Sequence, residues 1–288
     1  KQLAATLFAS ALALGTTITS HAQTGMTQPA ATRAASQPIS GEMRARQVIG
    51  KDVRNQQGEN LGKVDDLIID MNGERVYYAL VSFGGIMGVG DKKFVFPVGS
   101  FQSAGNDLVL NVDKDALKKA PGFDSQRRPG MSSNNFYRDV DRFYKIEGGQ
   151  QLPKEARLVS ANDLIGSKVN DHGQHNAGKI EDLVVNFGTG RTYAVLGVDE
   201  SWSPKSKLVA LPLNAFHVPN RPGVPIMLNV DRPGIETARG FDNNTWPDLN
   251  SANYQREVSD QLLSFQTKIK RNPAETQSGR ETASGTSK

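Results

Sequence analysis

Short apolar runs, separated by glycine, asparagine and aspartate, fill most of the chain between residues 47 and 230. Valine, isoleucine, leucine and tyrosine dominate these runs, and such segments between turn residues are typical of β-strands. The pattern predicts strands over 47–53, 61–70, 75–83, 93–97 and 107–112, and again over 164–169, 177–186, 192–198, 207–212 and 226–230. Short strands with tight turns favour a mainly β fold of small closed barrels, because closure removes exposed strand edges.

A helical spacing replaces the strand pattern after each set of strands. Over 254–270 the apolar residues recur every three or four positions, which places them on one face of a helix. This stripe consists of Tyr254, Val258, Leu262, Phe265 and Ile269. We expect Asn253 to cap the helix and Pro273 to stop it. A shorter stretch over 135–146 repeats the pattern, with Phe136, Val140, Phe143 and Tyr144 on one side. Each stripe packs on its own barrel or, alternatively, docks a partner or a membrane surface.

The two sets of strands are copies of one another. Residues 62–67 (GKVDDL) match 178–183 (GKIEDL) with a shift of 116 positions. At the same shift, Arg75 and Tyr77 match Arg191 and Tyr193. Later matches are shifted by 118 positions: Gly122-Phe123-Asp124 with Gly240-Phe241-Asp242, and Val140 with Val258. A repeat of roughly a hundred residues predicts two tandem modules of one fold. Within the first, Asn72-Gly73 indicates a hairpin turn, because both residues tolerate positive φ.

The organisation predicted from these patterns has six parts. They are a signal peptide (1–22), a flexible tether (23–42), a first domain with its helix (43–147), a linker (148–157), a second domain with its helix (158–271) and a disordered tail (272–288). Tether and tail consist mainly of small and polar residues, which cannot bury enough surface to offset their ordering entropy.

The first residues are typical of an address for export. Lys1 precedes the apolar run 3–14, and Ser20 and Ala22 supply the small residues of a cleavage site after Ala22. The run is shorter than the about 20 residues needed to cross a membrane. We expect the mature protein to be periplasmic or secreted; a retained N-terminal anchor is the alternative.

The amino-acid composition limits which partners and catalytic groups the protein can have. With 34 basic and 30 acidic residues among 288, the net charge of +4 is too small to indicate nucleic acid as a partner. The chain has no cysteine, which excludes disulfides, thiolate catalysis and cysteine-ligated metal. The fingerprints of serine hydrolases, zinc proteases and dinucleotide-binding proteins are missing from the sequence. We therefore expect neither a cofactor nor an enzymatic activity.

One motif set resembles a known family. In the first copy, Gly50 and the segment 62–70 (GKVDDLIID) precede a glycine-rich loop, 84–92 (GGIMGVGDK), which leads into 94–97 (FVFP). This resembles the PRC-barrel family, named for the photosynthetic reaction centre H subunit and found also in a ribosome maturation factor. The motif residues are Gly50, Gly62, Asp66, Asp70, Gly84, Gly85, Gly88, Gly90 and Pro97.

The resemblance implies two small β-barrels used as adaptor or assembly modules, with no catalytic residues to carry over. Exported tandem versions look like a bacterial subgroup of this family. The second copy departs from the motif, because 199–207 (DESWSPKSK) replaces the glycine-rich loop. Whatever that loop does in the first copy, the second copy cannot do in the same way.

Two turns offer candidate chemistry. Gly85 and Gly90 have the spacing of a phosphate loop, but a predicted strand follows and supplies no helix N-terminus for a phosphate. A connection between strands is the simpler interpretation. His172 and His175 flank a turn next to Asp171, and two imidazoles with a carboxylate can ligate Zn²⁺ or Cu²⁺. A solvated hairpin tip is the alternative interpretation.

The acidic pairs Asp65-Asp66 and Glu181-Asp182 occupy the same place in both copies. Neighbours on a strand point to opposite faces, so such a pair is poorly arranged for acid–base catalysis. We expect one member to hydrogen-bond a turn or to pair with Arg75 or Arg191. Trp202 either anchors a partner or packs as a lid over the mouth of its barrel.

These patterns favour an exported, non-enzymatic interaction or scaffold protein of the bacterial envelope. Its partner would be an unidentified protein in the periplasm or at the membrane surface. The alternative is a periplasmic protein that binds a small ligand or a metal at the barrel mouths or at the His172/His175 turn. A hydrolase of unfamiliar layout is a third hypothesis. A cavity with converging polar groups would favour ligand binding, whereas filled interiors and an exposed apolar patch would favour interaction.

Overall fold

The computed structural model describes residues 36–83, 92–112, 117, 119–124, 134–146, 151–203, 207–221 and 223–269. The signal peptide, most of the tether, the C-terminal tail and the loop carrying Gly84, Gly85, Gly88 and Gly90 lie outside these residues. The first copy contains β1 (Gln37–Pro38), β2 (Glu42–Arg44), α1 (Ala45–Val48), β3 (Asp52–Asn55), β4 (Asn60–Asp70), β5 (Arg75–Ser82), β6 (Lys92–Pro97), η1 (Val98–Ser100), β7 (Phe101–Ala104), β8 (Asp107–Leu110), β9 (Gly122–Asp124) and α3 (Asn134–Phe143).

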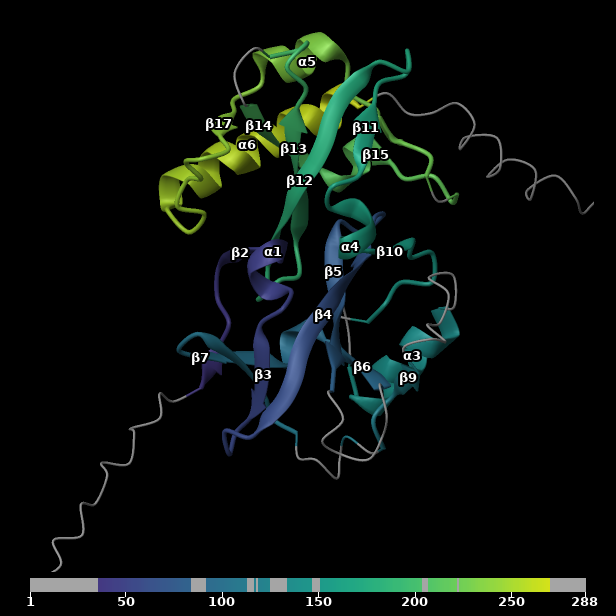
Figure 1. The fold of residues 1–288 in the computed structure, drawn as a ribbon, viewed down its shortest axis with the longest axis vertical. Helices are drawn as coiled ribbons and strands as arrows, with labels where there is room; N and C mark the ends of the chain where they lie inside the picture. The colour runs from purple at the N-terminus through teal and green to yellow at the C-terminus, as the bar shows by residue number, and fades with distance from the viewer. Residues whose placement is uncertain are drawn as a thin grey trace, which may run out of the picture. The chain divides into compact units, whose positions relative to one another are not determined.

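The second copy repeats this order. It contains β10 (Leu158–Ser160), α4 (Ala161–Leu164), β11 (Lys168–Asn170), β12 (Asn176–Asn186), β13 (Thr192–Val198), β14 (Lys207–Pro212), η3 (Leu213–Ala215), β15 (Phe216–His217), β16 (Ile226–Leu228), α5 (Arg232–Thr237), β17 (Phe241–Asp242) and α6 (Ala252–Lys268). The mainly β class and the two tandem modules predicted from the sequence are confirmed (Figure 1).

Each copy supplies most of the strands of one sheet. The strand order is β1-β7-β8-β3-β4-β5-β6-β9 in the first and β15-β16-β11-β12-β13-β14-β17 in the second. All neighbours are antiparallel except β3 with β8 and β11 with β16, which are parallel in both copies. Among the described residues, no hydrogen-bonded ladder joins the two ends of either path. The modules are therefore half-barrels rather than the closed barrels that the short strands suggested.

Two predicted strands begin as helical turns. The strands expected over 47–53 and 164–169 are preceded by α1 and α4, and the extended part starts only at Asp52 and Lys168. Ala45 and Val48, three positions apart, are both fully buried, as are Ala161 and Leu164. A spacing of three places both side chains on one face of a helical turn. One turn is too short to show a periodicity in the sequence.

The central strands correct the alignment of the copies by one residue. Tyr78 pairs with Ile68 and Val76 with Ile69, so Tyr77 is an extra residue in a β-bulge. In the second copy Tyr193 and Thr192 pair with consecutive residues of β12. Tyr193 therefore corresponds to Tyr78, not to Tyr77 as the sequence match suggested. A bulge absorbs one residue without moving the rest of the ladder.

The glycines at the start of the long strands are required by close backbone approach. Gly62 has φ of 143°, and a Cβ there would lie 2.1 Å from the carbonyl oxygen of Ser82. Gly178 has φ of 132°, and its Cβ would lie 1.9 Å from the carbonyl oxygen of Gly197. The turn at Asn72-Gly73 differs from the prediction, because Glu74, with φ of 52°, is the residue in the left-handed region.

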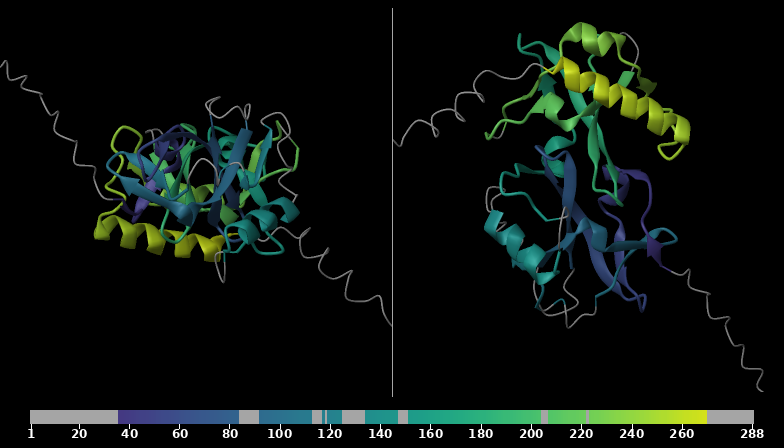
Figure 2. Two further views of the ribbon diagram at one scale, coloured as in Figure 1. Left: turned by 90° about the horizontal axis from the view of Figure 1, so that it is seen from below. Right: turned by 180° about the vertical axis from the view of Figure 1, so that it is seen from behind.

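Each helix packs on the sheet of its own copy. Helix α3 lies against β6, and α6 lies along β14 (Figure 2). Val258 and Phe265 are the buried residues of α6, and Tyr254 and Leu262 pack beside them. The N-cap is Ser251, whose hydroxyl accepts a hydrogen bond from the Tyr254 N–H, rather than the expected Asn253. None of the described helices is long and apolar enough to cross a membrane.

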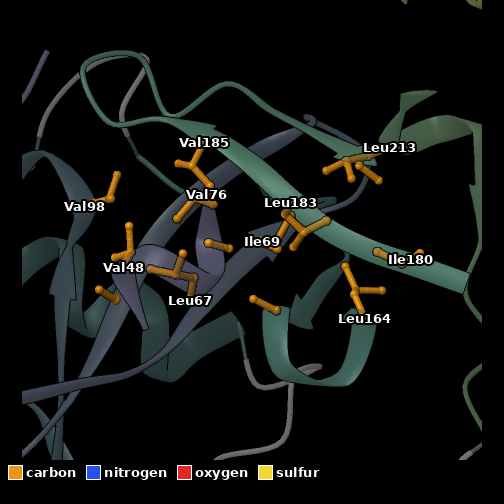
Figure 3. Close-up of a cluster of buried hydrophobic side chains, with 14 of the residues drawn as sticks. Val48, Leu67, Ile69, Val76, Val98, Leu164, Ile180, Leu183, Val185 and Leu213 are labelled. Atoms are coloured by element: carbon orange, nitrogen blue, oxygen red, sulfur yellow. The ribbon is translucent and has the colours of Figure 1, made fainter. Parts of the chain in front are cut away.

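The sheets do not follow the sequence boundaries of the copies. Strand β2 of the first copy pairs with β12, and β10 of the second copy pairs with β4. One continuous cluster of buried apolar side chains includes Val48, Leu67 and Ile69 together with Leu164, Leu183 and Val185 (Figure 3). We call this junction the seam, meaning β2–α1 on β12 and β10–α4 on β4.

Candidate functional site

The repeated carboxylate of the first copy holds a segment of the second. Asp66 on β4 is 1% exposed. Its side chain accepts a hydrogen bond from the Asn162 N–H at 3.1 Å and another from the hydroxyl of Ser160. It also accepts from the N–H of the following residue, Leu67, at 2.8 Å. The acceptor thus lies at the point where β10 turns into α4, and satisfies donors at the start of that helical turn.

Asp182 on β12 does the same in the opposite direction. It is fully buried and accepts hydrogen bonds from the Arg46 N–H at 3.2 Å and from the Leu183 N–H at 2.9 Å. The Arg44 Nε lies 2.8 Å from its second oxygen, so this half of the seam has an ion pair where the other half has a serine. The Arg44 guanidinium also lies 3.8 Å from the centroid of the Trp246 ring.

The other members of the acidic pairs are turned away from the seam. Asp65 pairs with Lys93 at 2.5 Å, and Glu181 pairs with Lys179 at 3.0 Å. The expected partners Arg75 and Arg191 instead form a β-bridge with each other. The prediction that one acidic residue of each pair supports the structure through hydrogen bonds is correct. The donors to this residue come from the other copy, which the repeat pattern alone does not show.

The two hairpin turns meet at the same junction. The Val76 N–H donates to the Gly190 carbonyl at 2.8 Å, and the Thr192 N–H donates to the Glu74 carbonyl at 2.9 Å. These two bonds are equivalent under the repeat. The seam therefore has approximate two-fold symmetry down to single hydrogen bonds.

Two buried tyrosines carry polar contacts at the helices. The Tyr193 hydroxyl bonds the Glu42 carboxylate at 3.0 Å and lies 3.3 Å from the Tyr254 hydroxyl. Burial raises the pKa of Glu42 above its ordinary value, although the Tyr193 hydrogen bond and Arg191 act against this. In the first copy the Tyr78 hydroxyl donates to Asp141 at 2.8 Å.

Asp141 closes the corresponding network in the first copy. It is 6% exposed and also accepts a hydrogen bond from the Leu152 N–H at 2.9 Å. Burial raises its pKa, and the two hydrogen bonds partly offset that shift. The network therefore ties helix α3 to the strand and to the linker that leads into β10.

The histidine turn has a local role. His175 Nδ1 lies 3.1 Å from an oxygen of Asp171, whose other oxygen accepts the His175 N–H at 2.8 Å. His172 is exposed in the same turn. Among the described residues, no three His, Cys, Asp or Glu side chains gather in a way that could hold a metal ion. His172, His175 and Asp171 are therefore not gathered into such a group, and only their proximity in the sequence favours the metal hypothesis.

The aromatic and apolar candidates are largely packed inside the molecule. Trp202 is 5% exposed, joins the main core and lies beneath the Arg232 guanidinium. Trp202 is therefore packed in the core and is not presented at the surface as an anchor. Val258 and Phe265 are buried against the second sheet, with Tyr254 and Leu262 half-buried. Val258 and Phe265 are therefore covered by the second sheet, and only Tyr254 and Leu262 keep part of their side chains exposed.

The described motif residues of the first copy have structural positions. Gly50 takes a left-handed φ of 90° between α1 and β3. Asp70 is buried and accepts hydrogen bonds from the N–H groups of Gly73 and Arg157, so it joins a turn to the linker. Pro97 pairs with Tyr78 at the end of β6. Sequence reasoning missed Arg44, Ser160 and Asn162. Arg44 and Ser160 come just before the helical turns α1 and α4, and Asn162 lies inside α4.

A cavity of about 170 Å³ lies between α6 and the end of β17. Phe241, Pro247 and Tyr254 form much of its apolar lining, and an ion pair of 2.9 Å between Arg239 and Glu257 lies beside them. It is a surface groove of the second copy and not a barrel mouth.

The fold and the seam define a class: a mainly β protein of two tandem modules whose repeated acidic residues join the modules to each other. The PRC-barrel domain matches residues 40–117 and again residues 157–232. These two matches cover more than half of the chain, which therefore belongs to the PRC-barrel family. The comparison with curated proteins gives no match.

Proposed function

We propose that this chain is an exported, non-enzymatic interaction or scaffold protein of the bacterial envelope. The observation that supports it is the use made of Asp66 and Asp182, the acidic residues repeated in both copies. Both are buried, and both hold a segment of the other copy. The acidic residues that both copies share therefore work as structural acceptors. Two modules tied together by buried contacts suit a protein that holds partners.

The exposed apolar side chains are the natural contact points for a partner. Among the described residues the large ones are Phe143, Val224 and Leu263, which are 43%, 49% and 61% exposed. Single exposed apolar residues are common on any protein, so each needs its own test. Phe143 and Leu263 lie on α3 and α6, the elements that differ most between the copies.

The test uses the chain from Gln23 onward as bait in periplasmic extract, with Phe143→Ser and Leu263→Ser baits beside it. We expect one of these variants to lose a captured protein at an unchanged melting temperature. Gln266→Ala, a change at an exposed position of α6, is the matched control and should keep the partner. A capture that none of the variants weakens, or no capture at all, would speak against the proposal.

Export needs a separate measurement. If 1–22 is a cleaved signal, N-terminal sequencing of the exported protein should start at Gln23, and the protein should fractionate with the periplasm. A product that retains earlier residues would contradict cleavage after Ala22 and favour an anchor.

A second candidate, binding of a small ligand, is favoured by the groove beside α6. An apolar lining next to a charged pair is the usual composition of a ligand site. A thermal-shift screen should then find a ligand whose stabilisation disappears in Glu257→Gln. In the metal version of this hypothesis, Zn²⁺ should stabilise the protein, and His172→Ala should remove the effect. Stabilisation that survives both changes would exclude these two sites.

A further inference from the structure

The contacts that join the two copies are made twice, once in each direction. On β12, Glu42 faces Asn186 and Arg44 faces Val184. On β4, Leu158 faces Asp70 and Ser160 faces Ile68, which are the same positions under the repeat. Each copy therefore provides a docking segment, strand plus helical turn, and a groove that receives such a segment.

The docking segments make a buried interface of the kind that obligate partners form. Val48 and Leu164 are fully buried in the continuous core, and each segment ends on a buried carboxylate of the other copy. Without the segment, β12 or β4 would present an unpaired strand edge beside exposed apolar surface. A copy with an empty groove would therefore lack one strand of its sheet and part of its buried core.

None of these contacts requires the segment and the groove to belong to one chain. After α3, the chain from Gln151 onward packs on the first copy through Leu152 and Arg157 and then forms β10. If the connection between Ile146 and Gln151 leads to a second molecule instead, every seam contact can form between the first copy of one chain and the second copy of another.

We propose that two chains associate by exchanging halves in this way. The first copy of each then binds the second copy of the other through the seam. The contact is reciprocal, so the assembly closes at two chains and leaves no groove empty. Because no contact is lost, the exchanged dimer and the single chain differ mainly in connection entropy and protein concentration. High concentration during folding favours the dimer, and dilution favours the single chain.

The ion pair at one half of the seam provides a selective test. Arg44 meets Asp182 at 2.8 Å, whereas the other half uses Ser160 and Asp66. A chain with Arg44→Asp places two acidic side chains together within itself, and a chain with Asp182→Arg places two basic ones together. In an exchanged mixture of the two chains, one junction pairs the two introduced charges and the other keeps the natural pair.

The two variants, carrying different tags, are refolded separately and as a mixture at high concentration. We expect the mixture to give a species of twice the chain mass that carries both tags, as measured by light scattering and tag capture. Each variant alone should give several-fold less of it. The double variant Arg44→Asp with Asp182→Arg in one chain is the matched control, because it restores an ion pair internally and should remain a single chain when dilute.

Two results would overturn the proposal. One is a mixture that stays at single-chain mass although the double variant folds. The other is equal dimer formation by each single variant, since association would then not use the seam. If the double variant does not fold, two tagged wild-type chains refolded together decide the matter: mixed dimers support exchange, and single-chain mass at every concentration refutes it. The inference does not rest on the proposed function.

Discussion

The two copies place a tyrosine at the same point of their central strand but hold it differently. Tyr78 donates its hydroxyl to Asp141, which lies on α3 of the same copy. Tyr193 bonds Glu42, which lies on strand β2 of the first copy, the strand that pairs with β12. The residue equivalent to Glu42 is Leu158, and it lies in the apolar cluster around Tyr78. The buried hydroxyl therefore reaches the helix of its own copy in both cases, through Asp141 or through Tyr254, and in the second copy it also contacts the seam.

This difference shows which positions the repeat constrains. The seam keeps its residues in pairs: Asp66 with Asp182, and the Val76 N–H with the Thr192 N–H. The helices have diverged, since α3 has 10 residues and α6 has 17. Phe265 of α6 lies beyond the point where α3 ends. Contacts between the copies must fit two surfaces at once, whereas a helix on its own sheet is free to change.

The largest loss of stability is expected from a substitution in the part of α6 that extends beyond the length of α3. Phe265 is 1% exposed in the main core, so Phe265→Ala should destabilise the protein by about 3–5 kcal/mol. Phe143→Ala at the end of α3 removes a side chain that is 43% exposed and should cost only about 1 kcal/mol. Denaturant unfolding measures both, and Leu262→Ala should fall between them. Equal losses at positions 265 and 143 would mean that the extra helix is not anchored in the core.

The next effect tests the equivalence of the seam halves. Asp66→Ala leaves the Leu67 and Asn162 N–H groups and the Ser160 hydroxyl without their acceptor, and should destabilise the protein by about 2–4 kcal/mol. Asp182→Ala should have a similar effect. Asp65→Ala, which breaks only a partly exposed pair with Lys93, is the control and should stay below about 1 kcal/mol.

A double-mutant cycle extends this test. Asp66→Ala combined with Ser160→Ala should show a coupling energy, although the two residues belong to different copies. Additive effects would show that the contact contributes nothing to stability.

Removing the tyrosine hydroxyls should have a smaller effect on stability, and each tyrosine should be coupled to a different carboxyl group. Tyr78→Phe and Tyr193→Phe should each destabilise the protein by about 1–2 kcal/mol, because the buried Asp141 carboxyl or the half-buried Glu42 carboxyl loses its donor. Coupling with Asp141→Ala is expected only for Tyr78, and coupling with Glu42→Ala only for Tyr193. Unfolding curves of the four double variants measure this. Coupling of Tyr193 to position 141 would contradict the separation of the two networks.

The smallest effect is a dependence on pH. Burial raises the pKa of Asp141 above its ordinary 3.8, so the folded state holds this proton more tightly than the unfolded chain. The stability it contributes is complete below the ordinary pKa and is lost as pH rises through the raised one. Asp141→Asn keeps a neutral group at every pH. Relative to the wild type, this variant should therefore gain stability as pH rises from acid to neutral.

Two comparisons sharpen this measurement. Ser259→Asn, at the equivalent exposed position of α6, should leave the pH profile of the unfolding free energy unchanged. Glu42→Gln should shift the profile in the same direction as Asp141→Asn, because burial also raises the pKa of Glu42. Identical profiles for the wild type and Asp141→Asn would show that Asp141 does not titrate in this range.

Much of each sheet follows from the sequence, because β4, β5, β12 and β13 are long apolar runs between clear turn residues. The helical turns α1 and α4 escape detection, since a single turn has no measurable period. The extra residue Tyr77 is invisible because a tyrosine precedes another tyrosine, and either fits the match. For Asp66 and Asp182 the sequence predicts a structural role. The sequence does not tell which copy supplies the donors, because both copies carry the same motif and a donor from either would fit it.

The strands that pair across the two copies, β2 with β12 and β10 with β4, have a consequence for the order of folding. Arg44 meets Asp182 across 138 positions, and Ser160 meets Asp66 across 94. A chain that emerges N-terminus first cannot complete its first sheet until Leu158–Ser160 has been made, however long the earlier strands wait. Until then β4 has an open edge, and Glu42–Arg44 has no strand to join. The first half alone therefore keeps an unpaired strand edge, which invites wrong pairing with other chains, until the second half begins to appear.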